Sequence, residues 1–146
     1  MQESKRIIDM KDCYKTINLS KLRQNVKVIK KYLKNCKFCA VVKSDAYGHN
    51  ASIVCRAICN YVDYLAVSSN DEAVAVRKLC PVTPCLILQP VSRYNLSDAI
   101  ECGATFSVQS KNDLQILNRE AKKLNKIAYY HLQINSGMNR FGITRK

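Results

Sequence analysis

A lysine at the end of a short apolar run is the residue with the clearest chemical potential in this sequence. Residues 39–43 read Cys-Ala-Val-Val-Lys, and a polar turn with Tyr47 and Gly48 follows. In α/β enzymes the reactive groups gather at the carboxyl ends of buried strands. A lysine whose stem lies at such a strand end is partly desolvated, which favours the free amine. Because a free amine can form a Schiff base with an aldehyde, Lys43 is the first candidate catalytic residue.

A second polar turn follows the last apolar segment of the chain and contains Met138 and Arg140. A planar guanidinium offers two parallel donors, a geometry that matches a carboxylate. A lone arginine in a turn is usually a solvated surface residue, and a lone lysine at a strand end usually extends to solvent. Residue type alone therefore leaves both functional roles open.

The segment around Lys43 resembles a known cofactor-attachment motif. Residues 40–50 read Ala-Val-Val-Lys-Ser-Asp-Ala-Tyr-Gly-His-Asn. They resemble the pyridoxal-phosphate attachment motif of the alanine racemases, whose usual form is Ala-Val-Val-Lys-Ala-Asp-Ala-Tyr-Gly-His-Gly. Ser44 and Asn50 are the departures from that form.

The segment around Arg140 resembles a second motif of the same family. Residues 131–142 read His-Leu-Gln-Ile-Asn-Ser-Gly-Met-Asn-Arg-Phe-Gly. They are similar to the family's Thr-Gly-Met-x-Arg-Leu-Gly pattern, with Ser136 and Phe141 in the threonine and leucine places. Residues 64–77 resemble the family's second strand and the helix after it, so the resemblance extends from about residue 15 to residue 143.

The resemblance implies a role for each candidate residue. Lys43 would hold pyridoxal 5′-phosphate and then exchange the α-proton on the face used for the D-amino acid, while the cofactor ring accepts the electrons. Tyr47 would hydrogen-bond the cofactor phosphate. Arg140 would bind the substrate carboxylate region, and Met138 would contribute a backbone group near that carboxylate.

Three neighbouring residues have supporting roles in this interpretation. We expect Gly48 to adopt a backbone conformation that other residues avoid. His49 could act as a base, but we interpret it as a structural residue. Many family members carry, in the place of Gln133, a lysine that becomes carbamylated and orients the arginine. Glutamine cannot be carbamylated, but its amide oxygen can accept a hydrogen bond.

Apolar segments and helical patterns alternate along the chain. This alternation indicates parallel βα units in which helices cover the strands. Serine caps indicate helix starts at Ser20 and Ser110, and Ser69 with Glu72 forms a capping box for a helix that ends before Pro81. We expect further helices at 51–60 and 92–102, and strands at 39–43, 64–68, 85–89, 104–108 and 127–134.

Periodicity alone is compatible with an open doubly wound sheet or with a (β/α)8 barrel. The resemblance implies the barrel, so the expected fold class is α/β, a partial (β/α)8 TIM-type barrel with about five βα units. Residues 1–146 would form the N-terminal part of the cofactor-binding barrel. The remaining strands and a mostly β C-terminal domain would lie elsewhere, and either the chain is a fragment or a partner chain completes the barrel.

Composition narrows the choice of partners. The formal net charge is +13, from 24 Lys and Arg against 11 Asp and Glu, which attracts anions. The lysines are scattered over predicted helices without an aromatic stacking platform, so we predict no nucleic-acid partner. No apolar run is long enough to cross a membrane, and residues 1–10 lack an apolar leader. These patterns predict a cytoplasmic protein.

The eight cysteines do not form an obvious framework. Without a secretion signal they argue against disulfides. Cys36 and Cys39 have the spacing of a zinc site, but the sequence offers no second ligand pair and only two histidines. We therefore predict no metal and expect most cysteines, including Cys39 in its apolar strand, to be buried thiols.

The leading interpretation is a pyridoxal-phosphate-dependent alanine racemase, which interconverts L- and D-alanine for cell-wall synthesis. The family is a head-to-tail homodimer whose second base is a tyrosine from the C-terminal domain of the partner. We therefore predict that this chain alone does not racemise alanine at a useful rate. The alternatives are a racemase for serine or another amino acid, a barrel-type decarboxylase, a non-catalytic pyridoxal-phosphate-binding protein and an inactive remnant.

Overall fold

The main body of the protein is a parallel β-sheet of five strands. The computed structural model describes residues 8–10 and 13–144. All neighbouring strands run parallel, in the order β3-β4-β5-β6-β7, so the expectation of about five βα units is confirmed. The strands are β3 (Cys39–Val41), β4 (Tyr64–Val67), β5 (Cys85–Ile87), β6 (Thr105–Val108) and β7 (Tyr129–Leu132).

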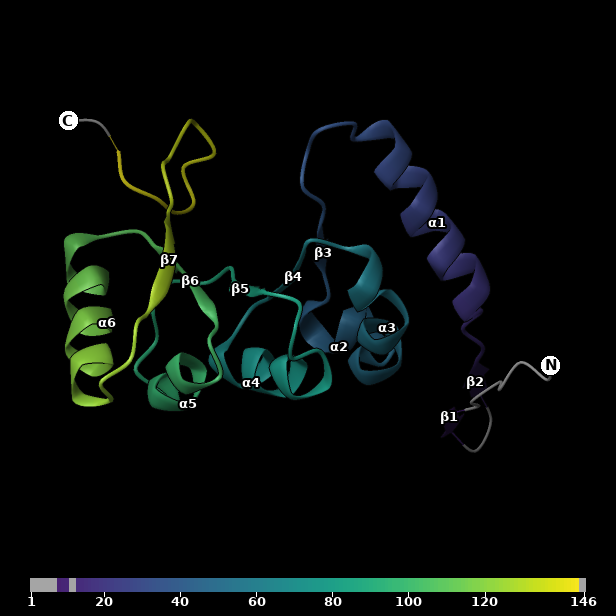
Figure 1. Cartoon of the computed structure of the whole chain (residues 1–146), viewed down its shortest axis with the longest axis horizontal. Coiled ribbons are helices and arrows are strands. Elements are labelled where there is room, and N and C mark those ends of the chain that lie inside the picture. Colours follow the sequence, from purple (N-terminus) through teal and green to yellow (C-terminus); the bar gives the residue numbers. More distant parts are fainter. Residues whose placement is uncertain (1–7, 11–12, 145–146) are drawn as a thin grey trace.

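Helices follow the strands and wrap around one side of the sheet (Figure 1). Two of the expected caps are confirmed, because the hydroxyls of Ser69 and Ser110 accept from the backbone N–H groups of Glu72 and Asp113. The helices are α1 (Leu19–Tyr32), α2 (Lys43–Gly48), α3 (Ala51–Ile58) with the 3-10 turn η1 (Cys59–Tyr61), α4 (Asn70–Leu79), α5 (Leu96–Glu101) and α6 (Lys111–Lys123).

Two of the expected helix starts were wrong. Asn18, not Ser20, caps α1, because its side-chain oxygen accepts from the backbone N–H of Lys21. Both residue types are good caps, but α1 begins at Leu19, so Asn18 stands at the capping position and Ser20 lies inside the helix. The helix expected at 92–102 is shorter, because Asn95 adopts a left-handed conformation and α5 begins at Leu96.

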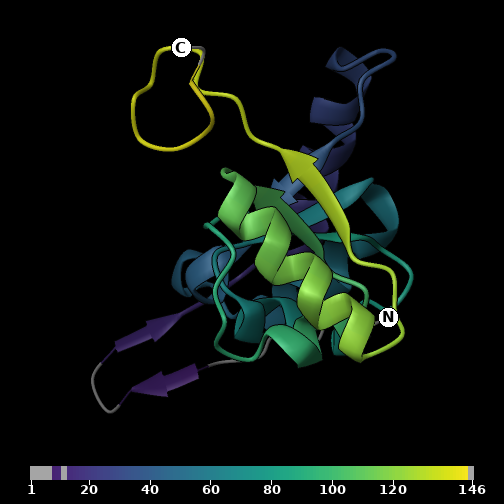
Figure 2. The ribbon, with the colours of Figure 1, turned by 90° about the vertical axis from the view of Figure 1, so that its left-hand side faces the viewer.

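The hydrophobic core fills the space between the sheet and helices α3 to α6. Strand residues that alternate along the sheet point toward the helices and are almost fully buried, and Phe106 and Leu65 are the two largest of them. From α6, Leu117 packs into the same cluster. Figure 2 shows α6 lying across the sheet from the side. The apolar faces of the strands and of the helices therefore pack into one hydrophobic core.

The opposite face of the sheet is the concave, inner side of the arc. Its side chains include the small residues Ala66 and Ser107, and the Ser107 hydroxyl donates to the carbonyl of Ile87 over 2.7 Å. The rings of Tyr64 on β4 and His131 on β7 lie 5.9 Å apart although two strands separate them. Side chains from such distant strands meet only when a sheet curls, as in a barrel. The partial-barrel prediction is confirmed.

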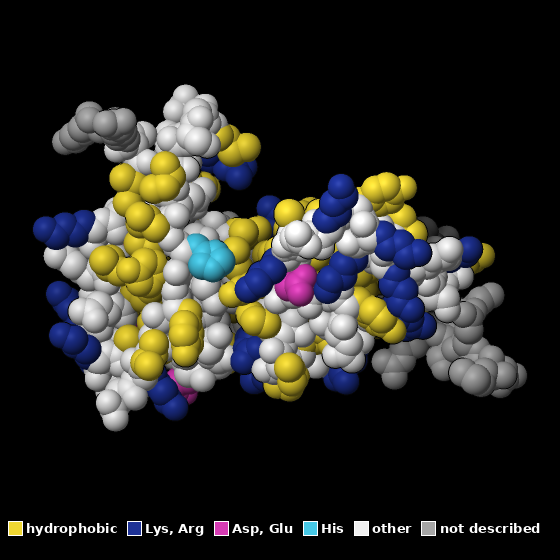
Figure 3. Space-filling model, turned by 45° about the horizontal axis from the view of Figure 1, so that its top comes forward, with side chains coloured by type: hydrophobic (Ala, Val, Ile, Leu, Met, Phe, Trp, Pro, Cys, Tyr) yellow, Lys and Arg dark blue, Asp and Glu magenta, His cyan; other side chains and the backbone are white. Residues whose placement is uncertain are grey.

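The strand β7 forms one edge of the sheet, and its side chains are exposed. Tyr129, Tyr130 and Leu132 are each about half exposed, and Ile134 after the strand is similar. Figure 3 shows hydrophobic side chains gathered along this edge and Lys and Arg side chains gathered over α1. An edge strand offers unpaired N–H and C=O groups, so this edge is suited to further pairing.

A short antiparallel hairpin lies before α1 and was not expected from the sequence. It pairs β1 (Ile8–Met10) with β2 (Cys13–Lys15). The expectation about a leader concerned residues 1–10, and of these residues 1–7 lie outside the described part. Strands of three residues are too short to leave a clear periodic signal in a sequence.

The expectation of buried thiols is confirmed for part of the cysteines. Cys55, Cys80 and Cys85 are buried, and burial raises the pKa of the Cys55 thiol to about 11. Cys39 is a correction, because it is exposed on the inner face of β3. Its apolar neighbours belong to a strand, but half of the side chains in a strand point away from the helices.

None of the helices within residues 8–10 and 13–144 has the length and apolar character to cross a membrane.

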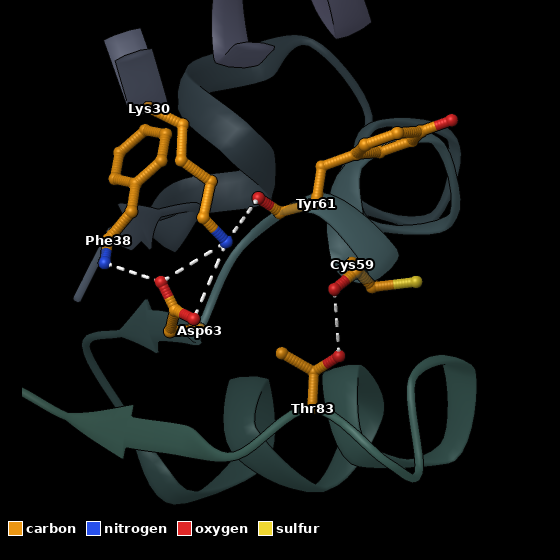
Figure 4. A network of polar contacts seen from close by, with 6 residues as sticks. All are labelled: Lys30, Phe38, Cys59, Tyr61, Asp63 and Thr83. Atoms are coloured by element: carbon orange, nitrogen blue, oxygen red, sulfur yellow. Dashed lines mark hydrogen bonds and ion pairs between the residues drawn. The ribbon is translucent and has the colours of Figure 1, made fainter. Parts of the chain in front are cut away.

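A polar network joins α1 to the start of the sheet (Figure 4). The carboxylate of Asp63 accepts from the backbone N–H of Phe38 over 2.7 Å and pairs with the ammonium group of Lys30 at 3.4 Å. The Lys30 ammonium also donates to the carbonyl of Tyr61 over 3.3 Å. The hydrogen bond from Phe38 and the charge of Lys30 lower the pKa of the Asp63 carboxyl below its ordinary value of 3.8.

This lowered pKa predicts a pH-dependent contribution to stability. A carboxyl with a lower pKa in the folded state stabilises the protein above its unfolded pKa, and that stability is lost as the pH falls through the folded value. We expect Asp63→Asn to lower the free energy of unfolding above about pH 5 and to matter progressively less in more acidic solution. Urea unfolding of both proteins across this range measures the difference, and a difference that stays constant with pH would contradict the assignment.

Arg77 joins three segments near the starts of β5 and β6. From α4, its Nε donates to the carbonyl of Cys102 over 2.8 Å, and its Nη1 donates to the carbonyl of Thr83 over 2.9 Å. Thr83 is itself buried, and its hydroxyl donates to the carbonyl of Cys59. The guanidinium therefore satisfies two loop carbonyls for which the described residues provide no helix or ladder donor.

Removing this guanidinium should destabilise the fold measurably. We expect Arg77→Met to lower the free energy of unfolding by about 1–3 kcal/mol, because two carbonyls lose a charged donor while the aliphatic stem is retained. Lys78→Met is the matched control, since Lys78 is exposed on the next position of α4. Denaturant unfolding of the two variants gives the comparison, and equal effects would show that the carbonyl bonds contribute nothing.

Candidate active site

Lys43 lies directly after β3, at the carboxyl edge of the sheet. The strand ends at Val41, and Lys43 is the first residue of α2 rather than the last residue of the strand as we expected. The buried side chains of Val42 and Ala46 anchor the turn on both sides of it. The Lys43 side chain is half-buried, and it has no hydrogen-bond or ion-pair partner among the residues that the structure describes. The amine therefore lies near this edge and forms neither a hydrogen bond nor an ion pair with the described residues.

The turn after Lys43 is a left-handed helical turn. Four consecutive residues, Ser44 to Tyr47, have φ between 52° and 56° and ψ between 39° and 52°. The left-handed helix costs an L-residue about 1–2 kcal/mol, so the four residues cost about 4–8 kcal/mol. That sum is comparable with the whole stability of a typical domain, about 5–15 kcal/mol, so surrounding contacts must hold the turn.

Two side chains hold this turn against neighbouring segments. The ammonium group of Lys15 donates to the carbonyl of Gly48 over 2.7 Å. The carboxylate of Asp45 accepts from the backbone N–H of Ala51 over 2.6 Å and so links the turn to the start of α3. Gly48 itself has φ of 76°, which confirms the expectation that it adopts a conformation other residues avoid.

His49 contacts the turn rather than a neighbouring reactive group. Its Nδ1 lies 2.9 Å from the carbonyl oxygen of Ala46, so this nitrogen carries the hydrogen. The bond closes the end of the turn and agrees with the structural role we expected. The ring of Tyr47 is 59% exposed, and the role of its hydroxyl toward a phosphate stays a prediction.

The second candidate segment is a loop that follows β7. The side-chain oxygen of Asn135 accepts from the backbone N–H groups of Gly137 and Asn139. The Asn135 N–H donates to the carbonyl of Ile143, and Ile143 forms a bridge with Ile134. The loop therefore returns to the end of its own strand and presents residues 136–142 at its tip.

Met138 and Arg140 lie at this tip and are exposed. Met138 is 78% exposed, and the Arg140 guanidinium lies over the ring of Phe141 at 5.6 Å from its centre. Gln133 is half-buried, and its backbone groups bond Val108 and Ile143. In the described part of the chain, no hydrogen bond joins the Gln133 side chain to Arg140. Among the described residues, the guanidinium therefore lies against an aromatic ring and is not hydrogen-bonded by Gln133.

The two segments lie at the same edge of the sheet but not in contact. Lys43 follows the first strand of the arc and Arg140 follows the last, so β4, β5 and β6 lie between them. Figure 1 shows α2 and the loop after β7 well apart. Within the described ranges no hydrogen bond or ion pair joins them. A ligand in contact with both would have to extend across the concave side.

Sequence reasoning missed one polar residue of this edge. Gln109 follows β6 at a position that alternates with Phe106 and Val108 and so faces the inner side with Ser107. Its Nε2 is buried and has no hydrogen-bond partner among the described residues. A buried donor without an acceptor is uncommon and marks a place where a ligand oxygen could bond. A single glutamine after a strand carries no recognisable signal in the sequence.

No metal site accompanies these residues in the part of the chain that the structure describes. No cluster of three or more His, Cys, Asp or Glu side chains there could bind a metal ion. The groups assembled at this edge are one amine, one phenol, one guanidinium and one buried amide, which are donors suited to an anionic organic ligand.

Comparison with known proteins identifies a family. Residues 17–146 match the family described as "Alanine racemase, N-terminal domain". Alanine racemase from Treponema denticola is 42% identical over 128 residues, which cover 86% of this chain and 34% of that protein. Alanine racemase 2 from Oceanobacillus iheyensis is 38% identical over 138 residues, which cover 93% of this chain and 35% of that protein.

Solved structures agree with this match. Alanine racemase from Clostridium difficile 630 superposes with a TM-score of 0.81 at 37% identity, over 88% of this chain and 34% of that chain. Alanine racemase from Oenococcus oeni gives a TM-score of 0.74 at 30% identity, over 86% of this chain and 36% of that chain. The chain spans about a third of the length of these relatives. By sequence and by fold, the chain belongs to the alanine racemase N-terminal domain family.

Proposed function

We propose that this chain carries the cofactor-attachment lysine of an alanine racemase, an isomerase that interconverts L- and D-alanine and supplies D-alanine for the cell wall. The family depends on pyridoxal 5′-phosphate. The observation that carries the proposal is the turn at Lys43. A half-buried amine at the carboxyl edge of a barrel sheet is presented by a turn that at least two side chains hold in a costly conformation.

The residues at this edge fit an anionic aldehyde. Lys43 offers an amine with no partner among the described residues, and Tyr47 offers a hydroxyl on an exposed ring. Gln109 adds a buried amide donor that lacks an acceptor in the same part of the chain. Donors without acceptors suit the oxygens of a phosphate and a phenol. Lys43 would hold the cofactor and Tyr47 would bond its phosphate.

The chemistry divides between the cofactor and the residues of this chain. Bound pyridoxal phosphate supplies an electron sink for the bond that breaks at the α-carbon. In one direction of the reaction the Lys43 amine would accept the α-proton on its face while an acid on the other face donates one, and in the reverse direction the Lys43 ammonium would donate a proton from its own face. Arg140 binds the substrate carboxylate and Met138 offers it a backbone group. A base on the other face is needed for racemisation, and we propose that a second subunit of a homodimer supplies it.

Covalent trapping tests this assignment. We expect the purified 146-residue chain, mixed with pyridoxal phosphate and reduced with borohydride, to gain one pyridoxyl group at Lys43 by peptide mass. The group should be absent in Lys43→Ala and present in Lys111→Ala, which removes an exposed lysine of α6. Labelling spread evenly over many lysines would contradict the assignment. Racemisation of alanine by the chain alone, abolished in Lys43→Ala, would contradict the prediction that the second base lies in a C-terminal domain outside these 146 residues.

A further inference from the structure

Glu72 connects the helix α4 to the turn that follows Lys43. The residue stands in the first turn of α4, and its backbone N–H donates to the hydroxyl of Ser69. One carboxylate oxygen accepts from the backbone N–H of Ser68 over 2.7 Å. The other accepts from the backbone N–H of Ser44 over 2.6 Å. The first two bonds belong to helix capping, and the third reaches a different βα unit.

A second helix of the same protein shows what capping alone requires. At the start of α6, the N–H of Asp113 donates to the hydroxyl of Ser110, and the Asp113 carboxylate accepts from the backbone N–H of Gln109 over 3.0 Å. The pattern matches that of Ser69, Glu72 and Ser68, one residue for one residue. An aspartate thus completes this cap, and the extra methylene of Glu72 is not needed for it. The longer side chain brings the bond to Ser44.

The bond to Ser44 acts on the peptide that joins it to Lys43. A peptide group is planar, so holding the Ser44 N–H fixes the plane attached to the Lys43 Cα. Ser44 is also the first of the four left-handed residues, so the bond holds the turn where it begins. A bond from an N–H to a carboxylate is about twice as strong as a neutral one. Glu72 is therefore suited to fix the direction in which Lys43 leaves the backbone.

We propose that Glu72 is the positioning residue for Lys43, through its carboxylate bond to the Ser44 N–H. The inference rests on the proposed function of Lys43 as the cofactor-attachment lysine. Glu72 does not touch the amine. It lowers the freedom of the backbone that carries the amine, and correct placement of a reacting group is worth large factors in rate.

The chain offers a variant that separates the two roles of Glu72. Glu72→Asp keeps a carboxylate for the cap, as Asp113 does in α6, but cannot reach Ser44. Glu72 borders an open hollow of about 480 Å³ with Val42 and Ala75, so the shorter side chain leaves no closed cavity. Ser69→Ala is the matched control, because it removes a capping bond of the same helix and leaves the carboxylate in place.

Two readouts test the proposal on the full 146-residue chain. The first is hydrogen exchange of the Ser44 amide without cofactor, which we expect to be on the order of ten- to hundredfold faster in Glu72→Asp. The second is the rate at which pyridoxal phosphate and borohydride label Lys43, which we expect to fall on the order of tenfold. Ser69→Ala should change neither the exchange rate nor the labelling rate, although it should lower the melting temperature at least as much as Glu72→Asp does. Glu72→Gln, which keeps the reach but not the charge, should restore part of both.

The outcomes distinguish this inference from the function on which it rests. Unchanged Ser44 exchange in Glu72→Asp overturns the positioning role, and so does an unchanged labelling rate when exchange has increased. Equal losses in Ser69→Ala also overturn it, because they would trace the effect to the helix cap. If Lys43 of the wild-type chain is labelled no faster than its other lysines, the proposed function itself is overturned, and the positioning role with it.

Discussion

Phe106→Ala is expected to remove a large part of the stability of this chain. Phe106 is the largest fully buried side chain, 1% exposed, on the middle of β6 where it packs between the sheet and the helices. Truncating a buried phenylalanine costs about 3–5 kcal/mol, because transfer energy is lost and a cavity remains. Against a typical total of about 5–15 kcal/mol, this loss is large enough to leave a substantial unfolded population.

Thermal and urea unfolding followed by circular dichroism measure this effect. Tyr32→Ala is the matched control, because it removes an aromatic ring that is 83% exposed on α1. We expect the control to change the free energy of unfolding by no more than about 0.5 kcal/mol. A Phe106→Ala protein that unfolds at the same urea concentration as the control would mean that the core does not lie between the sheet and the helices.

Gly142→Ala is expected to open the loop that carries Met138 and Arg140. A Cβ at residue 142 would lie 2.6 Å from the backbone nitrogen of Asn135 and 2.8 Å from the carbonyl carbon of Ile134. Backbone atoms cannot move away as a flexible side chain can, and φ of 104° is itself unfavourable for alanine. The two effects together cost about 2–5 kcal/mol, which matches or exceeds the roughly 1–3 kcal/mol that the two hydrogen bonds of the Ile134–Ile143 bridge provide.

Gly137→Ala is the control for this prediction, because it changes the same loop. Residue 137 also has a positive φ, but a Cβ there meets nothing within 4 Å. Hydrogen exchange of the Ile143 amide, which bonds the carbonyl of Gln133, reports on loop closure. We expect exchange to be at least tenfold faster in Gly142→Ala than in Gly137→Ala. Equal exchange in both variants would show that the close approach at Gly142 is not what closes the loop.

Most of the sheet was predictable from the sequence because two kinds of signal agreed. Each of the five main strands lies in a short, largely apolar or aromatic segment and within two residues of the range expected. The caps at Ser69 and Ser110 were found because a serine and an acidic residue three positions later satisfy free N–H groups in a recognisable spacing. Such caps can be predicted because they depend only on residues that are close together in the sequence.

The elements that were missed depend on contacts between distant residues. Ser44 to Tyr47 contain no glycine, and nothing in their order indicates a left-handed turn. The turn is held because Lys15 and Glu72 bond it from other elements and its own Asp45 bonds the start of α3. Similarly, the exposure of Cys39 follows from the open inner face of an arc, which the apolar pattern of its strand does not report.

The candidate site was predicted from two sequence motifs. The structure gives the position of each motif but does not bring the two into contact. Lys43 and Arg140 were found because their segments resemble a family pattern, and the family is confirmed. The arrangement of Arg140 over Phe141 and the buried donor of Gln109 could not be inferred, since both depend on side-chain packing at the edge of the sheet. The roles of Lys43, Tyr47, Met138 and Arg140 stay predictions.

The handedness of the turn after Lys43 has a consequence for chain chirality. A D-amino acid prefers the left-handed region for the same steric reason that an L-residue avoids it. Ser44 is exposed, so exchanging its side chain and α-hydrogen removes no core contact. Inverting this one residue by chemical synthesis would relieve the strain there, whereas the same inversion within α4 would break a right-handed helix. The backbone beside the proposed catalytic lysine therefore has the sense of the mirror-image amino acids.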